Sequence, residues 1–328
     1  MPPLYAGIDI GGTKILSIVA QDDGRIIGEQ QIATPVNAEP AVVLNDAAAC
    51  ARAAADLAGV PWSDIAAAGI AIAGPADYNR ALVTESPNLP AWRNVPAGAI
   101  IGELLGRPAL LENDANAAAL GEHRFGAGQG TRHMVYLTVS TGIGGGIIID
   151  GRLYRGASGS AGEFGHMVVQ PDGARCGCGN HGCLETVASG TAIERDAAQA
   201  LAEGYSGPLA RMLDASREMR AEFVEAAAKE GDEVAAAIIR TAGERFGVGL
   251  AAIVNILNPE VIVVGGGVSN MGERYLGPAE EAMRRHAFDL PARAVELRLA
   301  ALGKYSAALG AVVLASEGRR QAAPEGSA

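Results

Sequence analysis

The chain has 328 residues, which exceeds one ordinary domain and predicts two lobes with separate cores. Its formal charge of −11 disfavours nonspecific binding to nucleic acid or to anionic membranes. The N-terminus has no basic segment followed by an apolar one, and no stretch of about 18 uninterrupted apolar residues occurs. We therefore expect a cytoplasmic protein with neither nucleic acid nor a membrane as a partner.

The first predicted elements are two strands joined by a glycine turn. Residues 5–10 and 15–20 are apolar runs, and the segment between them reads Gly11, Gly12, Thr13 and Lys14. In Walker and Rossmann phosphate loops the glycines open a helix, and neither spacing occurs here. A glycine turn between strands exposes successive N–H groups that can bind phosphate oxygens. Taken alone, such a turn is more often only a tight hairpin, and Lys14 is equally consistent with a solvated strand residue.

The next candidate site residues, Asn113 and Asp114, follow a predicted helix and a predicted strand. Residues 41–58 are rich in alanine and predict a helix, in which Cys50 is most simply a small buried residue. A strand then ends near Leu111, and Asn113 and Asp114 precede a second helix at residues 115–120. Asn and Asp are preferred helix caps, so a capping role is one interpretation of this pair. A carboxylate at a helix N-terminus is also favoured in its charged form and can accept a hydroxyl proton.

The strand, turn and strand order returns in the middle of the chain. Residues 134–139 predict a strand, Thr141 to Gly146 predict a turn, and residues 147–149 predict the next strand. Two similar hairpins indicate two similar lobes. Two such turns facing each other could hold a polyphosphate from both sides, and the threonines beside the glycines favour this interpretation.

A metal site is predicted between Gly162 and Glu185. Thiolates and an imidazole are the ligands of tetrahedral zinc, and the predicted set is His166, Cys176, Cys178 and Cys183. Four protein ligands leave no position for a metal-bound water, so the zinc is expected to be structural. Two alternatives stay open: a disulfide pair with a spare thiol, and His181 in place of His166.

Helices are also predicted at residues 192–201, 226–240 and 244–257. The apolar strand 261–264 then leads into Gly265, Gly266 and Gly267. Glycine at this place allows a flat ring to approach the backbone.

Taken together, these motifs resemble the ROK family of bacterial sugar kinases and sugar-responsive repressors. The resemblance runs from about residue 5 to about residue 315, and its motifs occur in family order. It implies an α/β, two-lobed, actin-like and ribonuclease-H-like ATPase fold, with ATP and sugar in a cleft and a structural zinc loop. The expected division is residues 1–114 with about 303–316 in a smaller lobe, 115–302 in a larger lobe, and 317–328 as a flexible tail.

The resemblance also implies roles for individual residues. Asp114 is the expected base for the 6-hydroxyl of a hexose. Hexose hydroxyls are expected to contact Asn88, Asn113, Asp114, Glu163, His166 and Glu185. Asp9 is expected to hold Mg²⁺ or its waters. The nucleotide is expected to contact Gly11, Gly12, Thr13, Thr141, Gly142, Gly144, Gly145, Gly265 and Gly266.

A glucokinase-like enzyme that uses ATP is therefore the expected function, with Mg²⁺ and structural Zn²⁺ as cofactors and a homodimer or homotetramer as the assembly. N-acetylmannosamine, fructose and allose are alternative substrates. A sugar sensor related to the repressors is the alternative from another class. Those repressors place a DNA-binding module ahead of the sugar domain, and here the first turn already begins near residue 9. The two phosphate turns and Asp114 also favour turnover over sensing.

Overall fold

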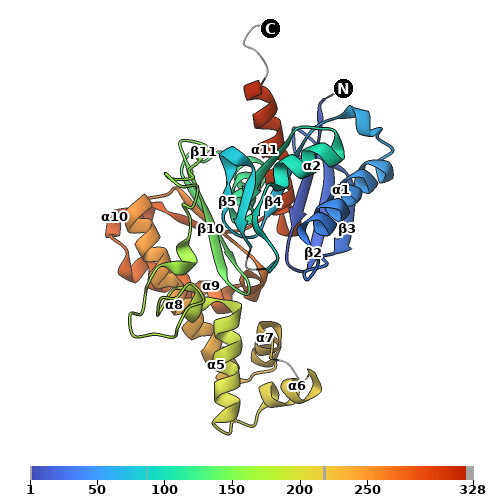
Figure 1. Cartoon of the computed structure of the whole chain (residues 1–328). Helices are drawn as coiled ribbons and strands as arrows, with labels where there is room; N and C mark the ends of the chain where they lie inside the picture. The colour runs from blue at the N-terminus through green and yellow to red at the C-terminus, as the bar shows by residue number, and fades with distance from the viewer. Residues whose placement is uncertain (1, 87, 217–218, 323–328) are drawn as a thin grey trace. The chain divides into compact units, whose positions relative to one another are not determined.

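The computed structural model describes residues 2–86, 88–216 and 219–322 (Figure 1). The chain forms two compact units. Unit 1 is the described part of residues 1–132, 146–162 and 300–328, and unit 2 comprises residues 133–145 and 163–299. Among the described residues, no helix has the length and apolar character needed to cross a membrane.

Unit 1 is built on a five-stranded sheet with the order β3-β2-β1-β4-β8. Its strands are β1 (Leu4–Ile10), β2 (Lys14–Gln21), β3 (Ile26–Ala33), β4 (Ile65–Ile72) and β8 (Ala109–Asn113). The first three strands pair antiparallel, whereas β1, β4 and β8 pair parallel. The predicted hairpin at residues 5–20 is confirmed, since Ile10 lies opposite Ile15 across the turn.

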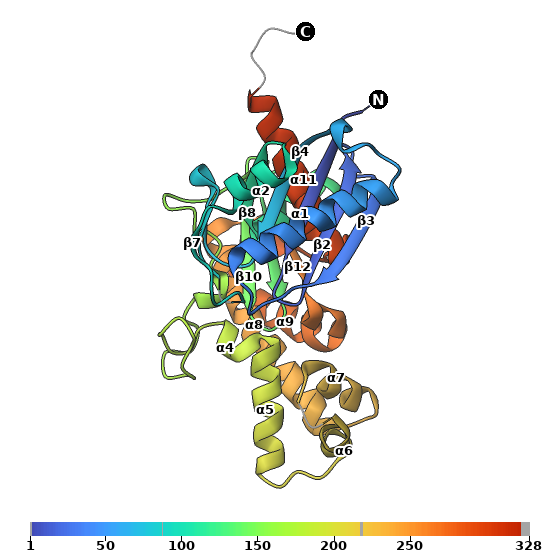
Figure 2. The same ribbon diagram turned by 45° about the vertical axis from the view of Figure 1, so that its right-hand side comes forward.

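Helices cover both faces of this sheet. Figure 2 shows α1 (Pro40–Leu57) crossing the strands on one face, where the even-numbered residues of β1 pack against it. The opposite face packs against α11 (Ser306–Ala322). A Cβ atom on Gly7 would lie 2.1 Å from the carbonyl oxygen of Ala308, so glycine is required for this close packing of helix on sheet.

The remaining elements of unit 1 include one largely buried helix as well as shorter elements. They are α2 (Ala97–Leu105), α3 (Asp114–Phe125), β11 (Arg152–Leu153), and a small antiparallel sheet of β5 (Ala76–Asp77), β6 (Leu82–Glu85) and β7 (Arg93–Val95). Helix α11 continues to Ala322, within the segment expected to be a flexible tail. Residues 323–328 of that segment lie outside the described residues.

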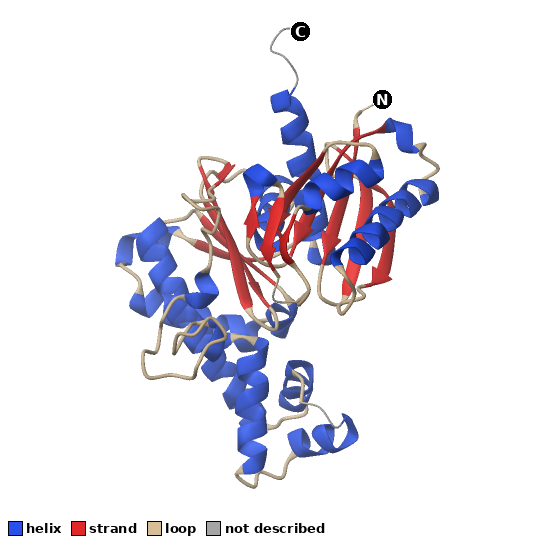
Figure 3. Ribbon diagram, viewed as in Figure 1, coloured by secondary structure: helices blue, strands red, loops and turns tan. Residues whose placement is uncertain are grey.

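The sheet of the second half repeats the topology of the first. Its order is β11-β10-β9-β12-β13, with β9 (Met134–Val139), β10 (Ile143–Ile149), β12 (Val261–Gly265) and β13 (Glu296–Leu299). As in unit 1, the central strand β9 has an antiparallel arm on one side and parallel strands on the other. Figure 3 shows helices around each sheet. This layout confirms the predicted actin-like α/β fold, while the lobe boundaries stay a prediction.

The three predicted helical regions of unit 2 are largely helical, with one correction, and the structure adds helices that the sequence did not predict. They are α4 (Glu185–Ala188), α5 (Gly190–Ala202), α6 (Pro208–Ser216), α7 (Ala221–Lys229), α8 (Glu233–Leu257), α9 (Glu273–His286) and α10 (Asp289–Ala294). The break expected between residues 240 and 244 is wrong, because α8 runs through it. The chain breaks before Glu233 instead, where the carboxylate of Asp232 caps α8 by accepting from the N–H groups of Val234 and Ala235.

Candidate active site and metal centre

The first glycine turn of unit 1 is held by its own backbone and by Thr34. The N–H of Gly11 donates to the carbonyl of Lys14 at 3.0 Å. Thr34 donates its hydroxyl to the carbonyl of Gly11 at 2.7 Å and its N–H to the carbonyl of Thr13 at 3.1 Å. Within the described part of the chain, the N–H groups of Gly12 and Thr13 donate no hydrogen bond. These two donors can therefore bind an anion.

The turn also carries a candidate sugar contact. A Cβ atom on Gly12 would lie 2.9 Å from the Cβ of Asn88, so the two residues are in direct contact. The family resemblance implied phosphate binding for Gly12 and hexose binding for Asn88. In the structure, the absence of a side chain at Gly12 is what makes room for Asn88.

Asp9 is the penultimate residue of β1, two positions before Gly11. Dense packing removes water from its carboxyl group, although part of the residue stays exposed. This desolvation, together with the negative charge of Asp114, raises the pKa of Asp9 to about 7, while Lys14 opposes the rise. Asp9 and Asp114 are thus electrostatically coupled within unit 1, and a cation beside them would favour the charged carboxylates. Lys14, left outside the predicted site, belongs to this group of charges.

The structure identifies Asn113 as the helix cap of this pair, while the base role of Asp114 stays a prediction. Asn113 is the cap of α3, since its side-chain oxygen accepts from the N–H groups of Ala115 and Asn116 at 3.0 and 3.1 Å. Its amide nitrogen donates to Oδ1 of Asp114 at 3.1 Å and to the carbonyl of Gly74 at 3.1 Å. Asp114 is the first residue of the helix, and its half-buried carboxylate is held by its neighbours.

The second glycine turn is shorter than predicted. Strand β10 already begins at Ile143, so the expected turn through Gly146 is wrong beyond Gly142. Gly144 and Gly145 lie in the strand. A Cβ atom on Gly145 would lie 2.5 Å from the ring of Phe164 and 2.8 Å from the carbonyl oxygen of Tyr136. This glycine therefore serves packing within the strand, which a pattern of glycines alone cannot distinguish from a phosphate turn.

Glu185 lies against this second turn. Its Oε2 accepts from the N–H of Ile143 at 3.0 Å, and a Cβ atom on Gly142 would lie 2.2 Å from the same oxygen. The other oxygen, Oε1, is 3.9 Å from the Sγ of Cys176. One carboxylate thus joins the glycine turn to the cysteine cluster. The turn meets the start of α5, where the N–H groups of Gly190 and Thr191 donate to the carbonyls of Ser140 and Thr141 at 2.7 and 3.4 Å.

Three cysteines and His166 form a compact ligand cluster. The possible ligand atoms of His166, Cys176, Cys178 and Cys183 all lie within 4.8 Å of one another. The Sγ atoms of Cys178 and Cys183 are 3.7 Å apart, and the Sγ of Cys176 is 3.6 Å from Nδ1 of His166. Tetrahedral zinc, with bonds of about 2.3 Å to sulfur and about 2.0 Å to nitrogen, separates two sulfurs by about 3.8 Å and sulfur from nitrogen by about 3.5 Å. The four residues fit this ion.

Of the two candidate histidine ligands, His166 lies in the cluster and His181 does not. His166 turns Nδ1 to the thiols, and its Nε2 lies 3.9 Å from Oε2 of Glu163. His181 is exposed and takes no part in the cluster formed by the described residues. All four cysteines carry free thiols.

The thiols of Cys176 and Cys183 favour their protonated form when no metal is bound. Burial raises the pKa of the Cys183 thiol to about 12 and also raises that of Cys176, whereas the backbone N–H of Asn180 lowers the pKa of Cys178. Three adjacent thiolates are therefore unfavourable without a metal. Zinc binding would displace protons from these groups, so its affinity depends on pH.

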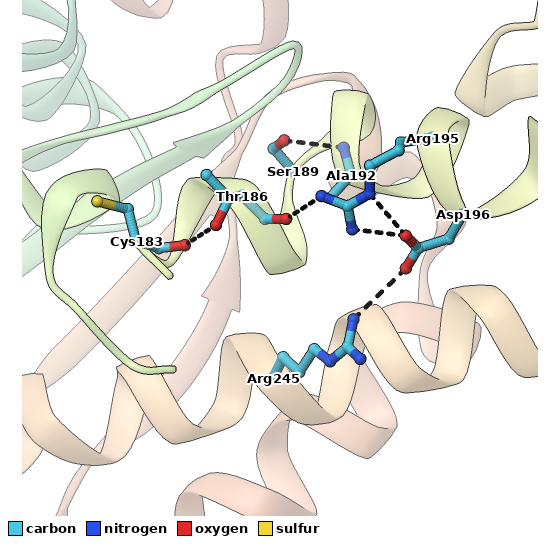
Figure 4. A network of polar contacts seen from close by, with 7 residues as sticks. All are labelled: Cys183, Thr186, Ser189, Ala192, Arg195, Asp196 and Arg245. Atoms are coloured by element: carbon cyan, nitrogen blue, oxygen red, sulfur yellow. Dashed lines mark hydrogen bonds and ion pairs between the residues drawn. The ribbon is translucent and has the colours of Figure 1, made fainter. Parts of the chain in front are cut away.

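A chain of polar contacts anchors one end of the metal loop. Figure 4 shows the carbonyl of Cys183 accepting from the hydroxyl of Thr186, and the carbonyl of Thr186 accepting from Arg195, both at 2.7 Å. Arg195 donates to Asp196, whose other oxygen lies 3.4 Å from the guanidinium of Arg245. Helices α5 and α8 thereby fix the position of Cys183. Neither these residues nor Thr34 could be predicted from the sequence, because lone polar side chains carry no spacing signal.

The third glycine cluster follows β12 in unit 2. Gly265 is the last residue of that strand. Gly266 has a φ of 88°, and a Cβ atom there would lie 2.3 Å from the carbonyl oxygen of Val139. Both conditions require glycine, whether or not a nucleotide binds beside it.

Comparison with known proteins gives consistent results. The sequence profile of the ROK family matches residues 5–318. A glucokinase from Streptomyces coelicolor is 38% identical over 318 residues, covering 96% of this chain and 98% of that protein. The solved ROK family glucokinase from Streptomyces griseus, in complex with glucose and AMPPNP, is 39% identical with a TM-score of 0.82, covering 96% and 99%. The solved ROK hexokinase from Thermus thermophilus is 38% identical with a TM-score of 0.83, covering 97% and 99%.

Proposed function

We propose that this chain, which belongs to the ROK family, transfers the γ-phosphoryl group of ATP to the 6-hydroxyl of D-glucose. The similarity to a glucokinase over nearly the full length supports this proposal. So does the glucokinase structure that contains glucose and a nucleotide analogue. The observation that carries the chemistry is the placement of Asp114. Its carboxylate begins a helix, is held by the cap residue Asn113, and is coupled to Asp9 beside the first glycine turn.

Asp114 is the proposed general base. It accepts the proton of the 6-hydroxyl as the oxygen attacks the γ-phosphorus, and the helix N-terminus favours its charged form. Asn113 orients the carboxylate through its amide. The hexose ring presents several hydroxyls, and the residues that we propose to bind them are Asn88, Asn113, Glu163, His166 and Glu185.

The phosphates are assigned to N–H groups of the glycine turns. In unit 1, Gly12 and Thr13 offer two donors, with Gly11 completing the turn. In unit 2, the assignment narrows to Thr141 and Gly142, because Glu185 already accepts from Ile143 and the next glycines lie in β10. Gly265 and Gly266 are kept as the proposed adenosine contact.

Two metal ions are proposed with different roles. Mg²⁺ takes carboxylate oxygens and water, and Asp9 is the group that would hold it, directly or through its waters. Zinc, held by the Cys₃His cluster, would supply structure only, because its four protein ligands leave no open position. With Nδ1 of His166 on the metal, Nε2 carries a proton and can donate to a sugar hydroxyl. We place the reaction in the cytoplasm, where thiols stay reduced.

A coupled assay over hexoses and phosphoryl donors tests the proposal. Glucose with ATP is expected to give the highest kcat/KM among glucose, N-acetylmannosamine, fructose and allose, with product phosphorylated at the 6-position. Polyphosphate is expected to be a poor donor. Hexose binding without turnover by any donor would contradict the proposal and would identify a sugar sensor instead.

A further inference from the structure

The residue two positions before Asp114 carries a buried charge. Glu112 is only 2% exposed, at the end of β8 in unit 1. A buried carboxylate is costly unless hydrogen bonds and an opposite charge compensate it. Among the described residues, the one cation that forms an ion pair with Glu112 is Arg155, whose Nε lies 2.6 Å from Oε2.

Arg155 is itself fixed in place. It lies in the segment after β11, and its guanidinium lies over the ring of Tyr78, 3.9 Å from the ring centre. The backbone carbonyl of Arg155 accepts from the N–H of Ala161 at 3.1 Å, which closes the segment into a loop. A planar guanidinium that stacks on a ring and pairs with a carboxylate has little freedom to move.

The second oxygen of Glu112 reaches both sides of Asp114. Oε1 accepts from the backbone N–H of Asn113 and from the side-chain amide of Asn116, both at 3.1 Å. Asn113 in turn donates to Asp114 and caps α3 through its own oxygen. The carboxylate of Glu112 therefore ties the residue before Asp114 to the first turn of the helix that Asp114 begins.

We propose that Arg155 is a positioning residue for Asp114, acting through Glu112. The inference rests on the proposed function, because it treats Asp114 as the base. With Arg155 in place, Glu112 has one orientation, and Asn113 and Asn116 hold the start of α3 in a fixed register. Without it, the carboxylate of Glu112 is left buried without its charge partner and turns or draws in water, and Asp114 shifts relative to the hydroxyl that it must deprotonate.

The test compares Arg155→Met with Arg152→Met. Arg152 is exposed on β11, three residues away, and serves as the matched control. For Arg155→Met, kcat and kcat/KM for glucose are expected to fall together by up to about 100-fold, as for a small misplacement of a catalytic group. KM is expected to change little, and Arg152→Met is expected to retain normal kinetics. A folded Arg155→Met variant with normal kcat would overturn the proposal.

A double variant separates positioning from general stability. If Arg155 acts through the base, then adding Arg155→Met to Asp114→Asn costs little further activity. Independent, multiplicative losses would overturn the proposal. Should Arg155→Met fail to fold, Glu112→Gln with Arg155→Met removes the unpaired buried charge, and the same low kcat is expected from it. A normal kcat in this pair would equally contradict positioning.

Amide hydrogen exchange tests the role of Arg155 independently of the proposed kinase activity. In Arg155→Met, the amides of Asn113, Ala115 and Asn116 are expected to exchange faster than in Arg152→Met. Unchanged protection of these amides from exchange would overturn the proposed role of Arg155, even if the enzyme were active. If the wild-type protein phosphorylated no hexose, the proposed function would fail, while the exchange measurement would still decide whether Arg155 holds the start of α3.

Discussion

The first glycine turn, Gly11 to Thr13, rests on Thr34 and contacts Asn88, whereas the second, Thr141 and Gly142, ends against the carboxylate of Glu185. Both follow the central strand of a sheet with the same strand order. The surroundings differ in chemistry. The first turn has an acidic pair of coupled carboxylates close by, and the second is linked through one carboxylate to a cluster of metal ligands.

The same strand order occurs in both sheets, and this difference indicates that the groups beside the two turns suit different tasks. In unit 1, the groups beside the turn suit proton transfer and cation binding, because the negative charge of Asp114 helps to raise the pKa of Asp9. In unit 2, the groups beside the turn suit recognition, because Glu185 lies against a loop whose Cys₃His cluster, with His166 as a member, fits a metal ion. Variants on one side should therefore affect kcat, and variants on the other side should affect affinity.

The largest expected effect is that of Asp114→Asn in unit 1. Asparagine has nearly the same shape but cannot accept the hydroxyl proton, so kcat is expected to fall by about 10²- to 10⁴-fold. Glucose affinity, measured by calorimetry, is expected to stay close to that of the wild type. Asp64→Asn, at an exposed position of the same unit, is the matched control. A near-normal kcat for Asp114→Asn would mean that this residue has no role as a base.

The second effect belongs to unit 2 and to the metal. Cys178 is the exposed member of the cluster, so Cys178→Ser removes a ligand without opening a cavity in the core. Bound zinc is expected to be lost, and glucose affinity is expected to fall by roughly 10- to 100-fold, with ATP affinity much less affected. Cys50→Ser, at a buried cysteine outside the cluster, is expected to keep the metal. Unchanged glucose affinity in a folded, metal-free protein would show that zinc does not orient His166.

A smaller effect is expected from breaking the contact between Glu185, a proposed sugar ligand, and the second glycine turn. Glu185→Ala leaves the N–H of Ile143 without its acceptor, and such a hydrogen bond to a charged group contributes about 1.5 kcal/mol to the stability of the turn. A turn weakened by this amount is expected to bind its ligands up to about tenfold more weakly. We expect KM for both glucose and ATP to rise. Glu185→Gln restores an acceptor and should recover the ATP value.

Glu163→Ala is the comparison for this variant. Glu163 lies near Nε2 of His166, and no contact joins it to the turn among the described residues. Its loss should raise KM for glucose only. If Glu185→Ala also left KM for ATP unchanged, the contact with Ile143 would have no role in nucleotide binding.

Local patterns in the sequence predicted the parts of this site that depend on neighbours in the chain. The first hairpin, the Asn113 and Asp114 pair before a helix, and the ligand cluster all have short spacings. The end of the second turn could not be predicted, because Gly145 is required by the packing of Phe164 from a distant segment. Neither could the contact of Asn88 with Gly12 or the support from Thr34, since each joins residues that only the folded chain brings together.

The smallest expected effect concerns the pH dependence of unit 1. The pKa of Asp9 is raised from 3.8 to about 7, first by desolvation and then by the charge of Asp114, with Lys14 acting in the opposite direction. Between these two values the folded protein keeps a proton that the unfolded chain has released, so stability falls as the pH rises. The slope from one such group is at most about 1.4 kcal/mol per pH unit, and it ends above pH 7.

Urea unfolding without Mg²⁺, from pH 4.5 to pH 8, measures this slope. Asp9→Asn has no proton to release, so the stability difference between it and the wild type isolates the contribution of Asp9. We expect that difference to change steadily up to about pH 7 and then to level off. Mg²⁺ is expected to stabilise the wild type more at pH 8 than at pH 6, because a cation favours the charged carboxylates. Stability profiles that run parallel over this pH range for the two proteins would show that Asp9 is already ionised in the folded state. Electrostatic coupling between Asp9 and Asp114 would then not be a feature that sets the first glycine turn apart from the second.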